Sequence, residues 1–124
     1  MFPTLNWIKR YLELLNKDEE LRLYGKKFNL LYAIESDNHK YVIQVKNGLF
    51  TINTDQEELP QLTLRTSSDH WMNFAEPTLV PTYTDLFGAA AHGKLEIQGD
   101  VQHIWSNIRS LWRSFEIMRK VGEV

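Results

Sequence analysis

The stretch from residue 93 to residue 118 constrains the fold most strongly, because its hydrophobic period changes without an interruption. Apolar Leu95 and Ile97 alternate with polar neighbours, which is the period of a half-buried strand. Gly99 permits a sharp turn, and Asp100 can accept hydrogen bonds at a helix start. Apolar residues then recur at helical spacing: Val101, Ile104, Trp105, Ile108, Leu111, Trp112, Phe115 and Met118. The pattern predicts a strand that turns directly into one long amphipathic helix.

The remaining faces of this predicted helix are polar. The side opposite the apolar stripe carries His103, Asn107, Ser110 and Ser114. One flank carries Arg109, Arg113 and Lys120, with Glu116 among them. We interpret this flank as a solvated face that is partly paired internally. An alternative is contact with anionic lipid headgroups or an acidic ligand head.

The first half of the chain predicts helices followed by an antiparallel meander. Residues 4–16 have a wide apolar arc and predict a helix, and Asp18 is expected to cap a short second helix that ends at Gly25. Residues 28–35, 40–46 and 49–53 predict three strands. The Asn47-Gly48 pair is the strongest short hairpin signal in the chain.

The second half predicts two more strands and two helices before the last one. Residues 54–60 are polar and acidic and predict an exposed loop, and residues 61–66 predict a fourth strand. Thr66 or Ser67 is expected to cap a short helix, and a further helix is predicted over 82–91, with Gly93 at its end. The predicted class is α+β, a single domain over 1–124 with helices packed on one sheet face.

Composition excludes several classes of protein. The 124 residues carry a formal net charge of −2 and no cysteine, so neither a nucleic-acid partner nor a disulfide scaffold is expected. No apolar run approaches the ~20 residues that span a bilayer, and the start lacks a signal-peptide pattern. We therefore expect a cytoplasmic protein.

Motifs for catalysis and metal binding are incomplete. Residues 88–94 nearly match a phosphate-binding loop, but Leu95 replaces its hydroxyl residue and a strand, not a helix, follows. The four histidines lack metal-ligand spacing. Asp69 and His70 lie beside Ser67 and Ser68 without the strand–turn–helix elbow of a nucleophile. No catalytic residue, metal or cofactor is expected.

Aromatic residues gather on the predicted helices of the last two-thirds of the chain: Trp71, Phe74, Tyr83, Phe87, Trp105, Trp112 and Phe115. An ordinary core is one interpretation of this pattern. A cavity for an apolar ligand, lined by aromatic and aliphatic side chains, is another. Hydrophobic periodicity cannot separate the two.

The Gly93-Lys94-Leu95-x-x-x-Gly99-Asp100 motif, placed between a helix end and an amphipathic helix, resembles the sterol carrier protein type 2 (SCP-2) lipid-transfer family. The segment 16–21, the Lys46-Asn47-Gly48 turn and the Leu62-Thr63-Leu64 strand also fit, so that the resemblance covers nearly the whole chain. We identify the chain as similar to the bacterial single-domain members.

The resemblance implies a five-stranded, mostly antiparallel sheet with an apolar tunnel between sheet and helices. It implies non-catalytic binding and transfer of a fatty acid, fatty acyl-CoA or sterol-like lipid. The residues expected to contact the lipid are Trp71, Phe74, Tyr83, Leu86, Phe87, Leu95, Ile97, Ile104, Trp105, Ile108, Leu111, Trp112 and Phe115.

The apolar stripe of the predicted last helix also bears on the partners and on competing functions. We expect a monomer or homodimer that makes transient contact with a membrane surface. An alternative is an accessory subunit whose aromatic stripe is covered by a partner chain or by a second copy. A third hypothesis is a lipid-modifying enzyme that uses His70 or His92, with Asp69 or His103, as acid or base.

Overall fold

The computed structural model describes residues 2–55, 57–78, 80–83 and 85–122. The first two helices are α1 (Leu5–Lys17) and α2 (Glu19–Tyr24), with N-caps Thr4 and Asp18. Strands β1 (Leu30–Glu35), β2 (Lys40–Lys46) and β3 (Leu49–Ile52) form the predicted meander. Asn47 and Gly48 have φ of 51° and 82°, so the predicted Asn-Gly hairpin turn is confirmed.

The second half continues with β4 (Leu62–Arg65), α3 (Ser68–Ala75), α4 (Leu86–Ala91) and β5 (Glu96–Gly99). It ends with α5 (Val101–Ser106) and α6 (Ile108–Met118). Ser67 caps α3 through a 3.2 Å hydrogen bond from the His70 N–H to its hydroxyl. Each strand predicted from a period of two is therefore present.

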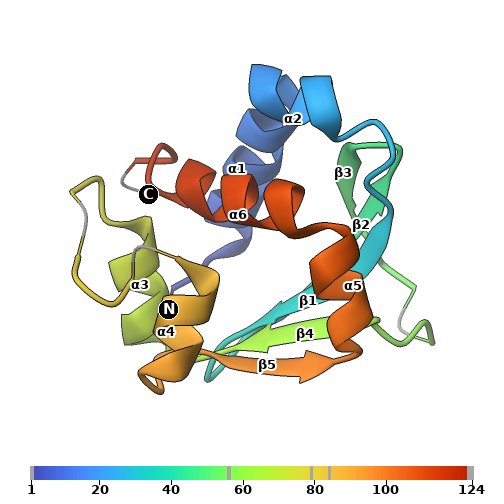
Figure 1. Cartoon of the computed structure of the whole chain (residues 1–124). Coiled ribbons are helices and arrows are strands. Elements are labelled where there is room, and N and C mark those ends of the chain that lie inside the picture. The colour runs from blue at the N-terminus through green and yellow to red at the C-terminus, as the bar shows by residue number, and fades with distance from the viewer. Residues whose placement is uncertain (1, 56, 79, 84, 123–124) are drawn as a thin grey trace.

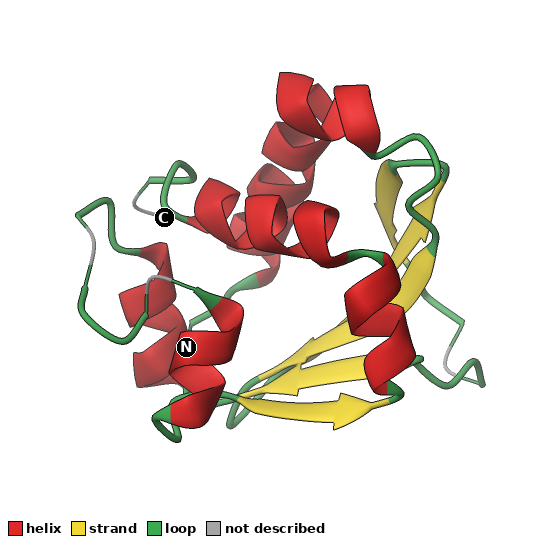
Figure 2. Cartoon of the chain, in the orientation of Figure 1, coloured by secondary structure: helices red, strands yellow, loops and turns green. Residues whose placement is uncertain are grey.

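The five strands form one sheet in the order β3-β2-β1-β4-β5. The β1–β2, β2–β3 and β4–β5 pairs are antiparallel, while β1 and β4 run parallel, with Tyr32 opposite Leu62. Figure 1 shows α1, α2, α5 and α6 on one side of this sheet, with α3 and α4 at one end. Figure 2 shows the same division between helices and strands. The predicted α+β class with helices packed on the sheet is confirmed.

The core lies between the sheet and these helices. Its sheet side consists of alternating residues of the strands, including Leu30, Tyr32 and Ile34 of β1, and its helix side includes Ile8 of α1 and Leu111 of α6. Burying such side chains gives roughly 1.5–3 kcal/mol each. The apolar positions of the alternating strand patterns therefore identify the face of the sheet that packs against the helices.

The predicted helix over 82–91 begins too early. Thr82 has a left-handed φ of 70°, and the Asp85 carboxylate accepts a 2.6 Å hydrogen bond from the Gly88 N–H. This N-cap starts α4 at Leu86, so Tyr83 lies in the preceding segment. The prediction also covered Thr84, which lies outside the described residues, as do Gln56 of the acidic loop and the Val101 side chain of the apolar stripe.

The prediction of one continuous last helix is wrong. Asn107 has φ −124° and ψ 22°, which ends α5 at Ser106 and restarts the chain as α6. Figure 1 shows that α5 and α6 run in different directions, so one apolar stripe cannot stay on one buried face across the break. Ser110 and Ser114 are consequently buried, whereas Trp105 and Trp112, expected in the apolar contact, are 66% and 44% exposed.

Candidate functional site

Some of the residues expected to contact a lipid form a closed aromatic cluster in the core, which we call the inner cluster. It consists of Trp71, Phe74, Tyr83 and Phe115. The Phe74 ring packs edge-on against Tyr83 and Phe115, with centroid distances of 5.1 and 5.5 Å. The Trp71 Nε1 donates a hydrogen bond to the Glu35 carbonyl at 2.9 Å, which fixes the indole against β1. The inner cluster joins α3 to α6.

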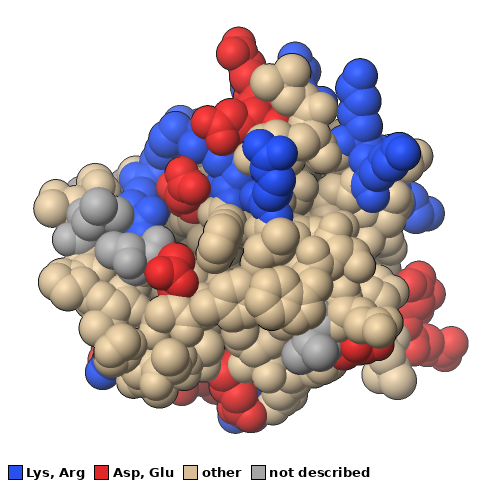
Figure 3. Space-filling model, in the orientation of Figure 1, with Lys and Arg blue, Asp and Glu red and all other residues tan. Residues whose placement is uncertain are grey.

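Other residues of the expected set form a second cluster at the surface, the outer cluster. It consists of Phe87, Trp105 and Trp112, one each from α4, α5 and α6. The Phe87 ring stacks on Trp105 at 5.6 Å and meets Trp112 edge-on at 6.1 Å. Figure 3 shows few charged side chains over α4, α5 and β5, while Lys and Arg gather over α2 and the start of α6. Trp105 and Trp112 are exposed and Phe87 is half-buried, and a contiguous exposed apolar patch is a candidate interaction surface.

The aliphatic members of the set belong to the hydrophobic core or pack against it. Leu86, Leu95, Ile104 and Leu111 are buried, and Ile97 and Ile108 are half-buried against the core. The structure thus divides the expected aromatic residues into a buried cluster and a surface cluster. The sequence could not show this division, because it depends on the break at Asn107.

Two buried tyrosines lie near each other in the core. The Tyr11 hydroxyl donates a 2.6 Å hydrogen bond to the Ser114 carbonyl and so ties α1 to α6. The Tyr32 hydroxyl is fully buried and has no hydrogen-bond partner among the described residues. Burial raises the pKa of both phenols, so both stay neutral and can act as hydrogen-bond donors.

The basic flank of the last helix is only partly solvated. The Arg113 guanidinium binds the Asp18 carboxylate through two hydrogen bonds of 2.8 and 3.0 Å, and both side chains are nearly buried. Glu20 and Glu116 also approach Arg113, at 3.5 and 3.2 Å. Arg113 therefore connects α6 to α2, and its hydrogen bonds hold the pKa of the Asp18 carboxyl below its usual value. Internal pairing was one of the two sequence interpretations, and for Arg113 it is confirmed.

Two of the residues considered for acid–base chemistry, His70 and His92, have hydrogen-bond partners. The His70 Nδ1 is hydrogen-bonded to the Tyr83 hydroxyl, and the His92 Nδ1 contacts the Gly88 carbonyl at 2.8 Å. Ser67 caps α3, as expected from the sequence. Among the described residues, no group of three or more His, Cys, Asp or Glu side chains is arranged to hold a metal ion.

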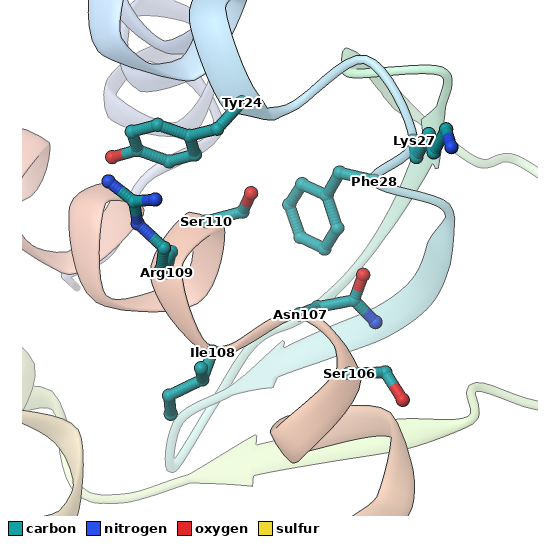
Figure 4. Close-up of a pocket in the computed structure, with 8 residues that line it drawn as sticks. All are labelled: Tyr24, Lys27, Phe28, Ser106, Asn107, Ile108, Arg109 and Ser110. Atoms are coloured by element: carbon teal, nitrogen blue, oxygen red, sulfur yellow. The ribbon is translucent and has the colours of Figure 1, made fainter.

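The structure also contains a pocket that the sequence did not reveal, which we call the α6 pocket. It has a volume of about 240 Å³ and lies between the end of α2 and the break before α6. Figure 4 shows its lining: Tyr24, Lys27, Phe28, Ser106, Asn107, Ile108, Arg109 and Ser110. The only sequence signal would have been Asn107, a helix-capping residue inside an apolar helical pattern.

Within the part of the chain that the structure describes, no helix is long and apolar enough to cross a membrane.

Comparison with solved structures defines the class of fold. A crystal structure of sterol carrier protein 2 matches with a TM-score of 0.76 and 16% identity, covering 98% of this chain and 100% of that one. The solution structure of a conserved hypothetical protein from Thermus thermophilus, described as possibly a sterol carrier protein, matches with a TM-score of 0.75 and 14% identity, covering 100% and 92%. A ubiquinone synthesis protein, UbiJ-SCP2, matches with a TM-score of 0.59 and 11% identity, covering 89% and 90%. This is the sterol-carrier-type α+β fold.

The family follows from the sequence profile of the SCP-2 sterol transfer family, which matches residues 8–106. The chain belongs to this family, as the Gly-Lys-Leu-x-x-x-Gly-Asp motif predicted. A search of curated protein sequences gives no significant match.

Proposed function

We propose that this protein binds an apolar lipid between the sheet and helices α4, α5 and α6, and transfers or presents it without chemical change. The outer cluster is the observation that carries the proposal. Trp105 and Trp112 are exposed and Phe87 is half-buried, while Leu86, Ile104 and Leu111 of the same three helices are buried. Membership of the SCP-2 family supports a lipid as the cargo.

The shortness of α4 and α5 would allow these two helices to move apart and admit a lipid. Helices α4 and α5 each have six residues, too few to be stable without packing against the rest of the protein. Each is followed by an irregular residue, His92 or Asn107, at which the backbone can bend. We propose that α4 and α5 separate, that the acyl chain or sterol enters beneath Phe87 and Trp105, and that the rings then cover it.

The energetics require no specific polar contact with the lipid chain. Each buried methylene contributes ~0.8 kcal/mol, so about sixteen methylenes give on the order of 12 kcal/mol before ordering costs. Micromolar affinity requires only about 8 kcal/mol. Shape and apolarity therefore suffice to select the cargo, and fatty acids, acyl-CoA and sterols are all candidates.

The test is saturable lipid binding by protein from which bound lipid has been removed. The titrated panel contains palmitate, palmitoyl-CoA, cholesterol and, because one structural relative is a ubiquinone synthesis protein, ubiquinone. Native mass spectrometry would give the stoichiometry. Tryptophan emission should shift to the blue as cargo covers Trp105 and Trp112. Absence of saturable binding by every lipid would refute the proposal.

Matched variants locate the site. Trp105→Ala should weaken binding about tenfold or more, because a largely exposed ring contributes little to the fold but much to covering the cargo. Leu23→Ala is the control, since Leu23 is 80% exposed on α2, away from the outer cluster. Equal losses of affinity in the two variants would contradict a site beneath the outer cluster.

The outer cluster also supports a second candidate, an accessory subunit or homodimer in which another chain covers Trp105 and Trp112. Sedimentation of the lipid-free protein distinguishes the two functions. A dimer that Trp105→Ala converts to a monomer, together with no lipid uptake, would favour the interface. His70→Ala and His92→Ala should leave lipid binding unchanged, because the proposal assigns them no chemistry.

A further inference from the structure

Helix α6 begins in the α6 pocket with free backbone donors. Asn107 occupies the N-cap position but makes no side-chain hydrogen bond to the first turn, because its Nδ2 donates to the His103 carbonyl at 2.9 Å. The Leu111 N–H donates to the Asn107 carbonyl. The N–H groups of Ile108, Arg109 and Ser110 have no partner among the described residues. These donors and the helix dipole favour a negative charge at this position.

Ser110 supplies a further donor at the pocket. The residue is only 5% exposed, and its hydroxyl forms no hydrogen bond with a described residue but keeps access to solvent through the pocket. By contrast, the Ser114 hydroxyl, one turn later, donates to the Leu111 carbonyl at 2.6 Å. Figure 4 shows the Ser110 hydroxyl directed between Tyr24 and Phe28, into the pocket. The Ser110 hydroxyl is therefore free to donate a hydrogen bond to a ligand or to water in the pocket.

The charged side chains that line the α6 pocket are positive, as an anionic ligand requires. Arg109 lies over the Tyr24 ring, with its guanidinium carbon 4.4 Å from the ring centroid, and so is held at the pocket. Lys27 lines the opposite side, and Figure 4 shows that its ammonium group points outward. Among the described residues, neither cation forms an ion pair with a carboxylate, whereas Glu20 is bound by Arg113.

We propose that the α6 pocket binds an anionic oxygen group, a phosphate or a carboxylate. The N–H groups of the first turn of α6, the Ser110 hydroxyl and the Arg109 guanidinium are its donors. Charge-assisted hydrogen bonds from a helix start and an arginine are the usual means of holding such a group. The Asn107 side-chain oxygen can accept a hydrogen bond from a protonated oxygen of the ligand.

Ile108 connects this pocket to the proposed lipid site. It lines the α6 pocket and also packs against the core, one helical turn from Trp112 of the outer cluster. An anion in the pocket can therefore be a free phosphate or the head group of a cargo whose chain lies beneath the outer cluster. The second source rests on the proposed function, and the experiment separates it from the first.

The first arm uses inorganic phosphate and the full chain. Titration at constant ionic strength, followed by amide NMR, should move the N–H signals of Ile108, Arg109 and Ser110 saturably. Ser110→Ala and Arg109→Gln should each weaken phosphate binding about tenfold, the loss of one charge-assisted donor. Ser114→Ala, whose hydroxyl is already paired, and Arg10→Gln, an exposed arginine of α1, are the matched controls.

The second arm compares palmitate with hexadecanol, which has the same chain without the charge. If the pocket holds the head group, palmitate binds about tenfold more tightly, and Arg109→Gln removes the difference without changing hexadecanol binding. A phosphate response with equal binding of acid and alcohol assigns the pocket to a free anion. No phosphate response and equal affinities overturn this inference but leave the lipid site standing, whereas failure of both lipids refutes the proposed function itself.

Discussion

Tyr32 places a hydroxyl inside the core where the fold offers no described partner. An unsatisfied buried hydroxyl costs about 1–3 kcal/mol. Tyr32→Phe removes the polar atom and keeps the ring, so we expect the lipid-free protein to become more stable by about 1 kcal/mol. Urea denaturation of both proteins checks this value. A less stable variant would show that a bound water or a lipid completes the hydroxyl.

Asp18 has two roles, the N-cap of α2 and the partner of Arg113. Asp18→Asn keeps a good capping residue but removes the charge, so it isolates the ion pair. We expect a loss of about 2 kcal/mol near neutral pH, the value of hydrogen bonds to a charged group. Glu19→Gln, an exposed change in the same helix, is the control and should be nearly neutral.

The same pair makes stability depend on pH. Because Arg113 lowers the pKa of Asp18 in the folded protein, the pair stabilises the fold above the unfolded pKa of ~4. This contribution is lost as the pH falls through the lower, folded pKa. The difference in stability between the wild type and Asp18→Asn should therefore shrink in acid. A difference that is constant from neutral pH to strong acid would show that the ion pair does not stabilise the protein.

At the scale of elements, the turn between β5 and α5 depends on a glycine. Gly99 has φ 125°, and a Cβ there would lie 2.4 Å from the Gln61 carbonyl oxygen of the neighbouring strand region. Gly99→Ala therefore combines backbone strain with a clash against backbone and should cost about 3 kcal/mol. Gly93→Ala is the matched control, because its φ is 72° but no atom lies within 4 Å, so only about 1 kcal/mol of strain is expected. Thermal unfolding distinguishes them, and equal losses would exclude the clash.

Elements were predictable where a local pattern determines them. The alternation in β1, β2 and β4, the Asp18 cap and the Asn47-Gly48 turn each follow from neighbouring residues. The break at Asn107 was not predicted, because the apolar spacing continues across it without a Gly or Pro. The Asp18–Arg113 pair and the α6 pocket depend on residues that meet only in the folded chain. Sequence patterns therefore indicated the expected lipid contacts, but not their division into inner and outer clusters.

At the scale of the whole molecule, α6 holds the two ends of the chain together. It contributes Leu111, Phe115 and Met118 to the core, accepts the Tyr11 hydrogen bond and carries Arg113. The family profile ends at Ser106, before this helix. A chain shortened to end at Asn107 should lose cooperative unfolding and expose its apolar surface to a hydrophobic dye. A cooperative transition in the shortened chain would show that α6 is dispensable for the fold.

The parallel β1–β4 pair has a consequence for synthesis on the ribosome. This pair joins two antiparallel units of the sheet. The first is β1–β3, which is contiguous in the chain, and the second is β4–β5, which requires the chain as far as β5. The first unit can pair as soon as it emerges, since its strands are joined by short turns. Helix α1, which is translated earlier, can cover part of the core face of this unit, but the rest stays uncovered until α6, the last helix translated, reaches α1. Slow translation of the C-terminal half would therefore lengthen the interval in which a nascent chain presents a partly covered apolar sheet to chaperones and to lipids.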